Sequence, residues 1–143
     1  MPDSLALLEL DSIARGYRTV DAMVKKSPVE VLEANLVEPG RYLILFAGGV
    51  AEVDEARSEG LEVAGNHLVH DLYLPMVHSS ILPGLRQELR CVDTDTVGVV
   101  ETCTISSCLL ACDRALKDAD VELAGLRITP ALGGKAYFVV PAN

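Results

Sequence analysis

An internal repeat constrains the fold of this chain most strongly, because one structural pattern has to be formed twice. Glu9 matches Glu101 at an offset of 92 residues. Five further pairs keep this offset: Ile13 and Ile105, Asp21 and Asp113, Lys25 and Lys117, Val29 and Val121, Glu30 and Glu122. Farther along, Gly40 matches Gly134 at an offset of 94, which places a two-residue insertion before the following strand. The chain is therefore predicted to be a tandem duplication.

A strand and a helix open the first copy. Residues 5–10 form an apolar run typical of a short buried strand, and Asp11-Ser12 then provides a helix N-cap. Ser27-Pro28 ends the helix, because the residue before a proline avoids the helical conformation. The apolar residues between these limits recur at i, i+4, i+7 and i+11: Ile13, Tyr17, Val20 and Val24. This spacing predicts an amphipathic helix.

Two strands, a second helix and a fourth strand complete the first copy. Residues 29–37 and 41–46 are predicted to pair as a hairpin, because proline and glycine in Glu38-Pro39-Gly40 favour a turn. A helix follows Gly48-Gly49, and residues 68–74 supply the last strand. The order β-α-β-β-α-β predicts a split, ferredoxin-like α+β fold, with helices on one face of a mainly antiparallel sheet.

The second copy repeats the opening strand and helix and two more strands. We expect these elements at residues 97–101, 105–117, 121–128 and 135–140. A short helical segment at 79–89 leads to this copy, and we assign domains to residues 1–90 and 95–143. The second domain lacks a counterpart of the last helix and strand. We therefore expect either a truncated second copy or a chain that continues beyond Asn143.

Composition excludes several classes of protein. Half of the 143 residues are apolar, which is ample for a packed core. The formal net charge of −9, without clustered lysine and arginine, argues against binding to nucleic acid. No apolar stretch is long enough for a membrane span, and no signal-like segment opens the chain. We therefore expect a cytoplasmic, globular protein.

The cysteines are predicted to be structural. The chain has four of them: Cys91, Cys103, Cys108 and Cys112. Cys108 and Cys112 are four residues apart, on the helical face that also carries Ile105, Leu109 and Leu116. Free cysteine is among the most buried residue types, so this face is expected to be core rather than a metal or redox site.

Several segments resemble a known family. Residues 7–16 (LLELDSIARG) and 97–102 (VGVVET) are similar to the opening strands of its two domains. Residues 21–25 (DAMVK) and 113–117 (DRALK) are similar to its helix motif ending in lysine, and residues 132–137 (LGGKAY) to its glycine-rich loop and third strand. The family is the bacterial microcompartment domain, especially the tandem-domain shell proteins of propanediol-utilisation compartments.

The resemblance implies a structural role in the shell of a bacterial microcompartment, and not an enzyme. Three chains would form a flat pseudohexamer, a homotrimer with a central pore, that packs against other shell proteins around enclosed enzymes. Two similar domains on a three-fold axis present six similar edges, which suits such a tile. The alternative is an oligomeric ferredoxin-like regulatory domain that binds a small ligand, because this fold hosts many functions.

The resemblance also assigns roles to particular residues. The helix-terminal lysine lies at the tile edge in this family, which points to Lys25 and Lys117; the alternative is a cation that merely favours a helix C-terminus. The loop before the third strand lines the pore, which points to Val37, Glu38, Pro39, Gly40, Pro130, Ala131, Leu132, Gly133 and Gly134.

Glu38 departs from part of the family. Some tandem members have a cysteine at this position, and three such thiolates can hold an iron-sulfur cluster on the axis. Glutamate disfavours that cofactor and predicts a ring of carboxylates, which would disfavour anions or attract cations. The alternative is a turn glutamate that simply faces solvent.

Other polar groups do not predict a metal or catalytic site. His70 and Asp71 point to opposite faces of a strand, so they cannot converge with His67 on one metal. His78 is close to Ser79 and Ser80, but no third group is identified that would orient it as a catalytic base.

Overall fold

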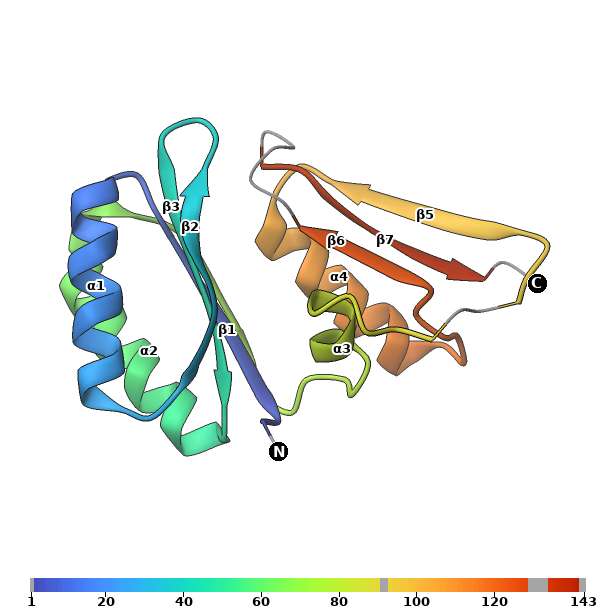
Figure 1. Cartoon of the computed structure of the whole chain (residues 1–143), viewed down its shortest axis with the longest axis horizontal. Coiled ribbons are helices and arrows are strands. Elements are labelled where there is room, and N and C mark those ends of the chain that lie inside the picture. Colours follow the sequence, from blue (N-terminus) through green and yellow to red (C-terminus); the bar gives the residue numbers. More distant parts are fainter. Residues whose placement is uncertain (1, 91–92, 129–133, 142–143) are drawn as a thin grey trace. The chain divides into compact units, whose positions relative to one another are not determined.

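A computed structural model describes residues 2–90, 93–128 and 134–141. The chain divides into two compact units, Met1–Val77 and His78–Asn143 (Figure 1). The connecting segment 78–90, which we assigned to the first domain from the sequence, lies in the second unit. Among the described residues, no helix combines the length and the apolar character that crossing a bilayer would require.

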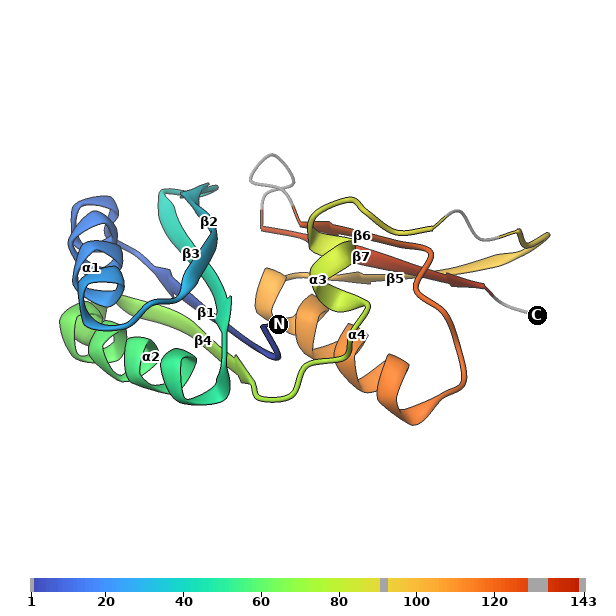
Figure 2. The same ribbon diagram turned by 60° about the horizontal axis from the view of Figure 1, so that its bottom comes forward.

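The first unit has the predicted element order. Its elements are β1 (Ser4–Leu10), α1 (Ile13–Lys26), β2 (Glu30–Val37), β3 (Arg41–Gly48), α2 (Val50–Ala64), the 3-10 turn η1 (Gly65–His67) and β4 (Leu68–Leu74). The strands form an antiparallel sheet in the order β2-β3-β1-β4. Helices α1 and α2 cover one face of this sheet, as Figure 2 shows. The split β-α-β-β-α-β fold is thus confirmed for the first copy.

Alternate residues of β1 and β3 face the helices and form one core cluster of the first unit, although both faces of these strands are buried. Leu8 of β1 pairs with Ile44 of β3, and both side chains are fully buried against the helices. Met23 of α1 and Ala56 of α2 join the same cluster. Each buried large apolar side chain contributes roughly 1.5–3 kcal/mol, so this layer is a substantial part of the stability of the unit.

Helix α1 has the predicted limits but not the buried face that its apolar stripe suggests. Ser12 caps it, because its Oγ accepts a hydrogen bond from the Arg15 N–H at 3.2 Å. The residues that the helix buries are Gly16, Thr19 and Met23, whereas Ile13, Tyr17 and Val24 are exposed. Gly16 is needed because a Cβ there would overlap the ring of Tyr42. A glycine therefore lets α1 approach the sheet.

The second unit contains the predicted strand, helix and two further strands. Its elements are α3 (Ile81–Leu85), β5 (Val97–Thr102), α4 (Ile105–Asp118), β6 (Gly125–Ile128) and β7 (Ala136–Pro141). The three strands form an antiparallel sheet in the order β5-β7-β6. Strand β6 is shorter than the predicted 121–128, although the Ala124 N–H still donates to the Val139 carbonyl at 2.8 Å.

Helix α4 buries the face that the sequence predicts. Ile105, Cys108, Leu109, Cys112 and Leu116 are all at most 5% exposed. Burial raises the pKa of the Cys108 thiol to about 11 and that of Cys112 to about 12, so both are protonated near neutral pH. The structural interpretation of these two cysteines is confirmed in their burial.

The remaining two cysteines differ from this pair. Cys103 is exposed, in the turn between β5 and α4. Cys91 lies outside the described residues.

Candidate functional site

The first candidate pore loop is the turn between β2 and β3. Glu38, Pro39 and Gly40 are exposed at its tip, and Gly40 has a positive φ of 69°. Val37, the last residue of β2, is 2% exposed, so its side chain points into the protein and not toward an opening. The structure therefore leaves three residues of this loop available to line a pore.

The second candidate loop precedes β7. Gly134 has a φ of 86° and directly precedes Lys135, as Gly40 directly precedes Arg41. Both copies thus place a glycine in the left-handed region, which other residues rarely adopt. Four residues assigned to this loop lie outside the described part of the chain: Pro130, Ala131, Leu132 and Gly133.

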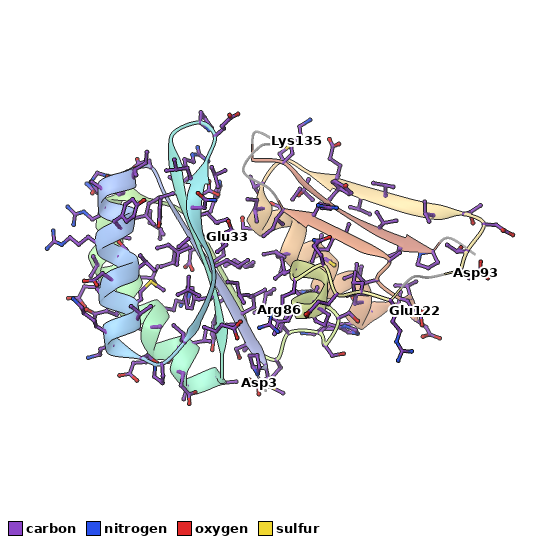
Figure 3. The ribbon with its side chains drawn as sticks, viewed as in Figure 1. Asp3, Glu33, Arg86, Asp93, Glu122 and Lys135 are labelled. Carbon is purple, nitrogen blue, oxygen red and sulfur yellow. The ribbon has the colours of Figure 1, made fainter. Side chains whose placement is uncertain are left out.

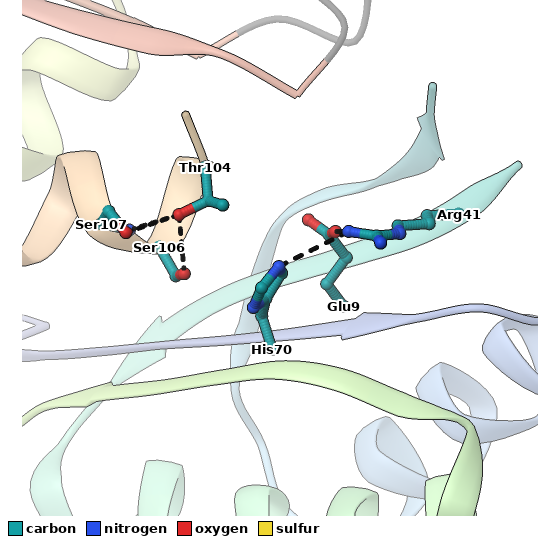
Figure 4. Close-up of polar contacts among 6 residues, drawn as sticks. All are labelled: Glu9, Arg41, His70, Thr104, Ser106 and Ser107. Atoms are coloured by element: carbon teal, nitrogen blue, oxygen red, sulfur yellow. Dashed lines mark hydrogen bonds and ion pairs between the residues drawn. The ribbon is translucent and has the colours of Figure 1, made fainter. Parts of the chain in front are cut away.

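An ion pair lies beside each loop, and neither pair was predicted from the sequence. Arg41 donates from one of its terminal guanidinium nitrogens to Glu9 Oε2 at 3.0 Å (Figure 4), and Glu9 is only 4% exposed. The same nitrogen is 3.5 Å from His70 Nε2. In the second copy, Lys135 Nζ donates to Glu101 Oε2 at 3.3 Å.

The internal repeat contained the signal for this pair, because both partners recur at matched positions. Glu9 matches Glu101, and Arg41 follows Gly40 as Lys135 follows Gly134. A glutamate on the first strand and a base at the start of the third strand therefore meet in each copy. The charge of the base next to each loop is compensated within its own domain.

The two helix-end lysines pair differently. Lys25 Nζ is 2.8 Å from Asp21 Oδ2, and both side chains are exposed. Lys117 Nζ is 2.9 Å from Asp113 Oδ2, but this carboxylate is buried and its Oδ1 also accepts the His78 N–H at 2.8 Å. Both lysines lie in the last turn of their helices. Lys117 is consequently held more firmly than Lys25.

The residues considered as metal ligands have separate partners. His67 Nδ1 is 2.9 Å from Asp11 Oδ1, whereas His70 contacts Arg41. Asp71 accepts two hydrogen bonds from Arg57, at 3.1 and 2.6 Å. Within residues 2–90, 93–128 and 134–141, no three histidine, cysteine or acidic side chains form a group that could hold a metal.

The segment around His78 orders a turn. Its Nδ1 accepts the Ser80 N–H at 3.1 Å, just before α3 begins. A cavity of about 630 Å³ opens beside this turn in the second unit. Its polar lining includes His78, Arg90, Asp93 and Glu122, the last two of which are labelled in Figure 3. A small ligand, as the regulatory alternative requires, would have space here.

Comparisons with known proteins agree on one family. The BMC domain matches residues 4–77 and 96–142. The bacterial microcompartment shell protein PduT of Citrobacter freundii is 39% identical over 144 residues, covering 100% of this chain and 78% of that protein.

Solved structures are similar as well. A microcompartments protein from Desulfitobacterium hafniense DCB has a TM-score of 0.88 and 35% identity, over 98% of this chain and 78% of that one. The fused permuted hexameric shell protein of the RMM microcompartment has a TM-score of 0.65 over 95% of this chain and 71% of its own. At 19% identity, the latter likeness concerns the fold alone.

Proposed function

This chain belongs to the BMC domain family and is a microcompartment shell protein, and from that premise we propose that three copies form a flat, pseudohexameric tile with a central opening. The observation that carries the proposal is the presence of two domain copies in one chain. Three such chains present six similar domains around an axis, so each tile has the outline of a hexamer. The role is structural, and the tile itself catalyses no reaction.

The exposed loop tips would line the opening. Glu38, Pro39 and Gly40 are exposed in the first copy, and the second copy would contribute residues 130–134. Because Arg41 is paired with the buried Glu9, its charge does not neutralise Glu38. Three Glu38 carboxylates would then make the opening anionic, which favours cations over anions.

An iron-sulfur cluster does not fit this loop. Such clusters are held by cysteine thiolates, and residues 37–40 offer a carboxylate from Glu38 but no sulfur. Cys108 and Cys112 are buried, with raised thiol pKa values, in helix α4. We therefore propose that the opening is a polar passage for metabolites and carries no redox centre.

Lys25 and Lys117 would form the contacts at the tile edge with neighbouring tiles and with other shell proteins. Both are on the last turn of a helix at matched positions, and Lys25 is 74% exposed. Lys117 is oriented by the buried Asp113, whereas Lys25 pairs with the exposed Asp21.

Native mass spectrometry of the purified chain tests the assembly directly. A particle of three chains is expected, with a denatured control that gives the mass of one chain. A stable monomer or dimer would contradict the tile. If such a particle also gained thermal stability on adding a small ligand, in a saturable way, the regulatory alternative would replace it.

The anionic opening has its own test. Glu38→Gln removes three carboxylates per tile and should lower the ratio of cation to anion permeability across reconstituted tiles. The matched control is Glu55→Gln, which removes an exposed carboxylate from helix α2. An unchanged ratio in the Glu38 variant would exclude this glutamate from the pore.

A further inference from the structure

His70 on strand β4 lies beside the ion pair that adjoins the first candidate pore loop. Its Nε2 is 3.5 Å from the guanidinium nitrogen of Arg41 that donates to Glu9 Oε2 at 3.0 Å (Figure 4). Glu9 and His70 are also direct partners across the antiparallel strands β1 and β4, so both side chains emerge on the same face of the sheet. A guanidinium, a carboxylate and an imidazole from three strands therefore share one site.

The hydrogen-bonding chemistry of arginine defines the form of His70 that this arrangement accommodates. A guanidinium can only donate hydrogen bonds, so the ring nitrogen that faces Arg41 has to be the unprotonated one. The neutral imidazole thus carries its proton on Nδ1. Because Arg41 and Glu9 contribute one charge of each sign, the net charge of the site is zero in this form.

Protonation of His70 upsets this balance. Histidine is the side chain that ordinarily changes its charge between pH 5 and 8. A protonated ring would place a second cation next to Arg41, and the single carboxylate of Glu9 would face both. Glu9 is only 4% exposed, whereas the Arg41 side chain is 35% exposed. The guanidinium is therefore the partner that can turn toward solvent while its aliphatic stem stays in place.

Other charged groups of the first unit lie farther from this site. Strand β2 presents Glu30 and Glu33 on the same face, but β3 and β1 separate this strand from β4. Asp71 follows His70 in sequence and points to the opposite face of the sheet, where it binds Arg57 of helix α2. The Glu9 carboxylate is thus the group for which both cations compete.

We propose that His70 is a pH-sensing residue that positions Arg41: its protonation draws Glu9 away from Arg41 and releases the guanidinium beside the opening. Arg41 directly follows the loop that carries Glu38, so the released cation would lie at the base of this loop and offset the Glu38 carboxylate. The preference of the opening for cations then decreases in acid, a consequence that rests on the proposed anionic opening.

The second copy provides no matching switch within residues 93–128 and 134–141. The side chains of Lys135 and Glu101 at the corresponding positions are 58% and 64% exposed. No histidine of the described chain bonds to this pair, and exposed ion pairs of this kind contribute little. The response to pH is therefore expected from the first loop alone, once in each chain.

The pH dependence of ion selectivity tests the switch on the full 143-residue chain. In the wild type, the ratio of cation to anion permeability across reconstituted tiles should fall by at least about twofold between about pH 8 and pH 5.5, because histidine gains its charge in this range. His70→Gln cannot gain a charge and should keep at both pH values the ratio that the wild type has at pH 8.

A second histidine of the same unit provides the matched control. His67 Nδ1 pairs with Asp11 Oδ1 at 2.9 Å and takes no part in the bonds of Arg41. His67→Gln removes a titrating ring of the same kind and should retain the full wild-type decrease. If His70→Gln does not fold, as judged by circular dichroism, His70→Asn replaces it with the same expected result.

Nuclear magnetic resonance follows the exchange of partners independently of the opening. The Nε–H signal of Arg41 should shift with the same midpoint as the ring signals of His70 in the wild type. In His70→Gln this arginine signal should stay in place over the same range of pH. The two readouts thus report on the local exchange and on its effect at the opening.

The outcomes separate the switch from the proposed opening. An Arg41 signal that ignores the titration of His70 overturns the switch, and so does a decrease in selectivity of full wild-type size in His70→Gln. A cation preference in the wild type that is the same at both pH values also overturns it. A wild type without any cation preference at pH 8 contradicts the anionic opening instead, and the Arg41 signal then decides on the switch.

Discussion

Asp21 and Asp113 occupy matched positions in the two copies, yet only one of them is part of a core. Asp21 is exposed and pairs with Lys25, whereas Asp113 is 3% exposed and bonds both Lys117 and the His78 N–H. The difference arises because the segment before the second copy packs beside α4, within the second unit. A repeated sequence thus specifies a repeated helix, while its surroundings decide which side chains are buried.

The two copies also differ in the sizes of the side chains where the first helix of each copy crosses its sheet. In the first copy Gly16 packs against Tyr42, and their counterparts in the second copy are Cys108 and Ala136. The second copy thus has a larger residue on the helix and a smaller one on the strand. Cys108 and Ala136 are both fully buried, so neither copy exposes these positions.

The largest expected effect is a difference in stability between variants of the buried apolar stripe on α4 and the exposed one on α1. Leu109→Ala should lower the free energy of unfolding by about 2–5 kcal/mol, because it leaves a cavity in a packed core. The matched Tyr17→Ala should cost at most about 1 kcal/mol, mainly through its ring contact with Tyr42. Urea denaturation at a concentration where the chain is monomeric measures both. Equal losses would contradict the difference in burial.

The next largest loss of stability is expected where helix α1 crosses strand β3, at Gly16 and Tyr42. Gly16→Ala should destabilise the protein by about 1–3 kcal/mol, because its methyl group would overlap the Tyr42 ring. In a Tyr42→Ala background, which resembles the second copy, the same change should be nearly neutral. A double-mutant cycle from thermal or urea unfolding provides the coupling energy. Additive effects would mean that α1 can shift away from the strand.

A similar loss of stability is expected when the buried carboxylate of Asp113 is removed. Asp113→Ala should cost about 1–3 kcal/mol, because the His78 N–H loses its acceptor. Asp21→Ala removes an exposed pair and should change stability by about 0.5 kcal/mol or less. Equilibrium unfolding of the two variants, side by side, checks this. A cost for Asp21 as large as that for Asp113 would refute the assigned role of burial.

The smallest effect concerns the thiols, all of which belong to the second half of the chain. At pH 8, iodoacetamide should modify the exposed Cys103 much faster than Cys108 and Cys112. The buried thiols have pKa values raised from 9.0 to about 11 and about 12, so the folded state keeps protons that the unfolded state loses. Stability should therefore fall as pH rises above 9. Rapid labelling of Cys108 in the native protein would contradict its burial.

Local signals predicted the elements well. Ser12 caps α1 at its start and Ser27 ends it, because each of these features depends on neighbours in sequence. The exposed side of α1 could not be predicted in this way. The spacing of Ile13 and Tyr17 indicates a helix, but not what its apolar stripe contacts.

The candidate site was predicted in part. The turn at Glu38 was found from proline and glycine, whereas the burial of Val37, which is 2% exposed, could not be predicted from its neighbours in sequence. The Glu9–Arg41 pair was missed because its partners are on different strands, 32 residues apart. The sequence signal for this pair is that a glutamate and a base recur at the matched positions Glu101 and Lys135.

The ion pairs beside the loops also show how one charge pair is adapted to two environments. A glutamate and a base meet at matched positions in both copies. Arginine remains where the glutamate is buried, and lysine is found where it is exposed. A guanidinium is more weakly hydrated and loses less on leaving water. Each copy thus forms the pair with the cation that suits the burial of its glutamate.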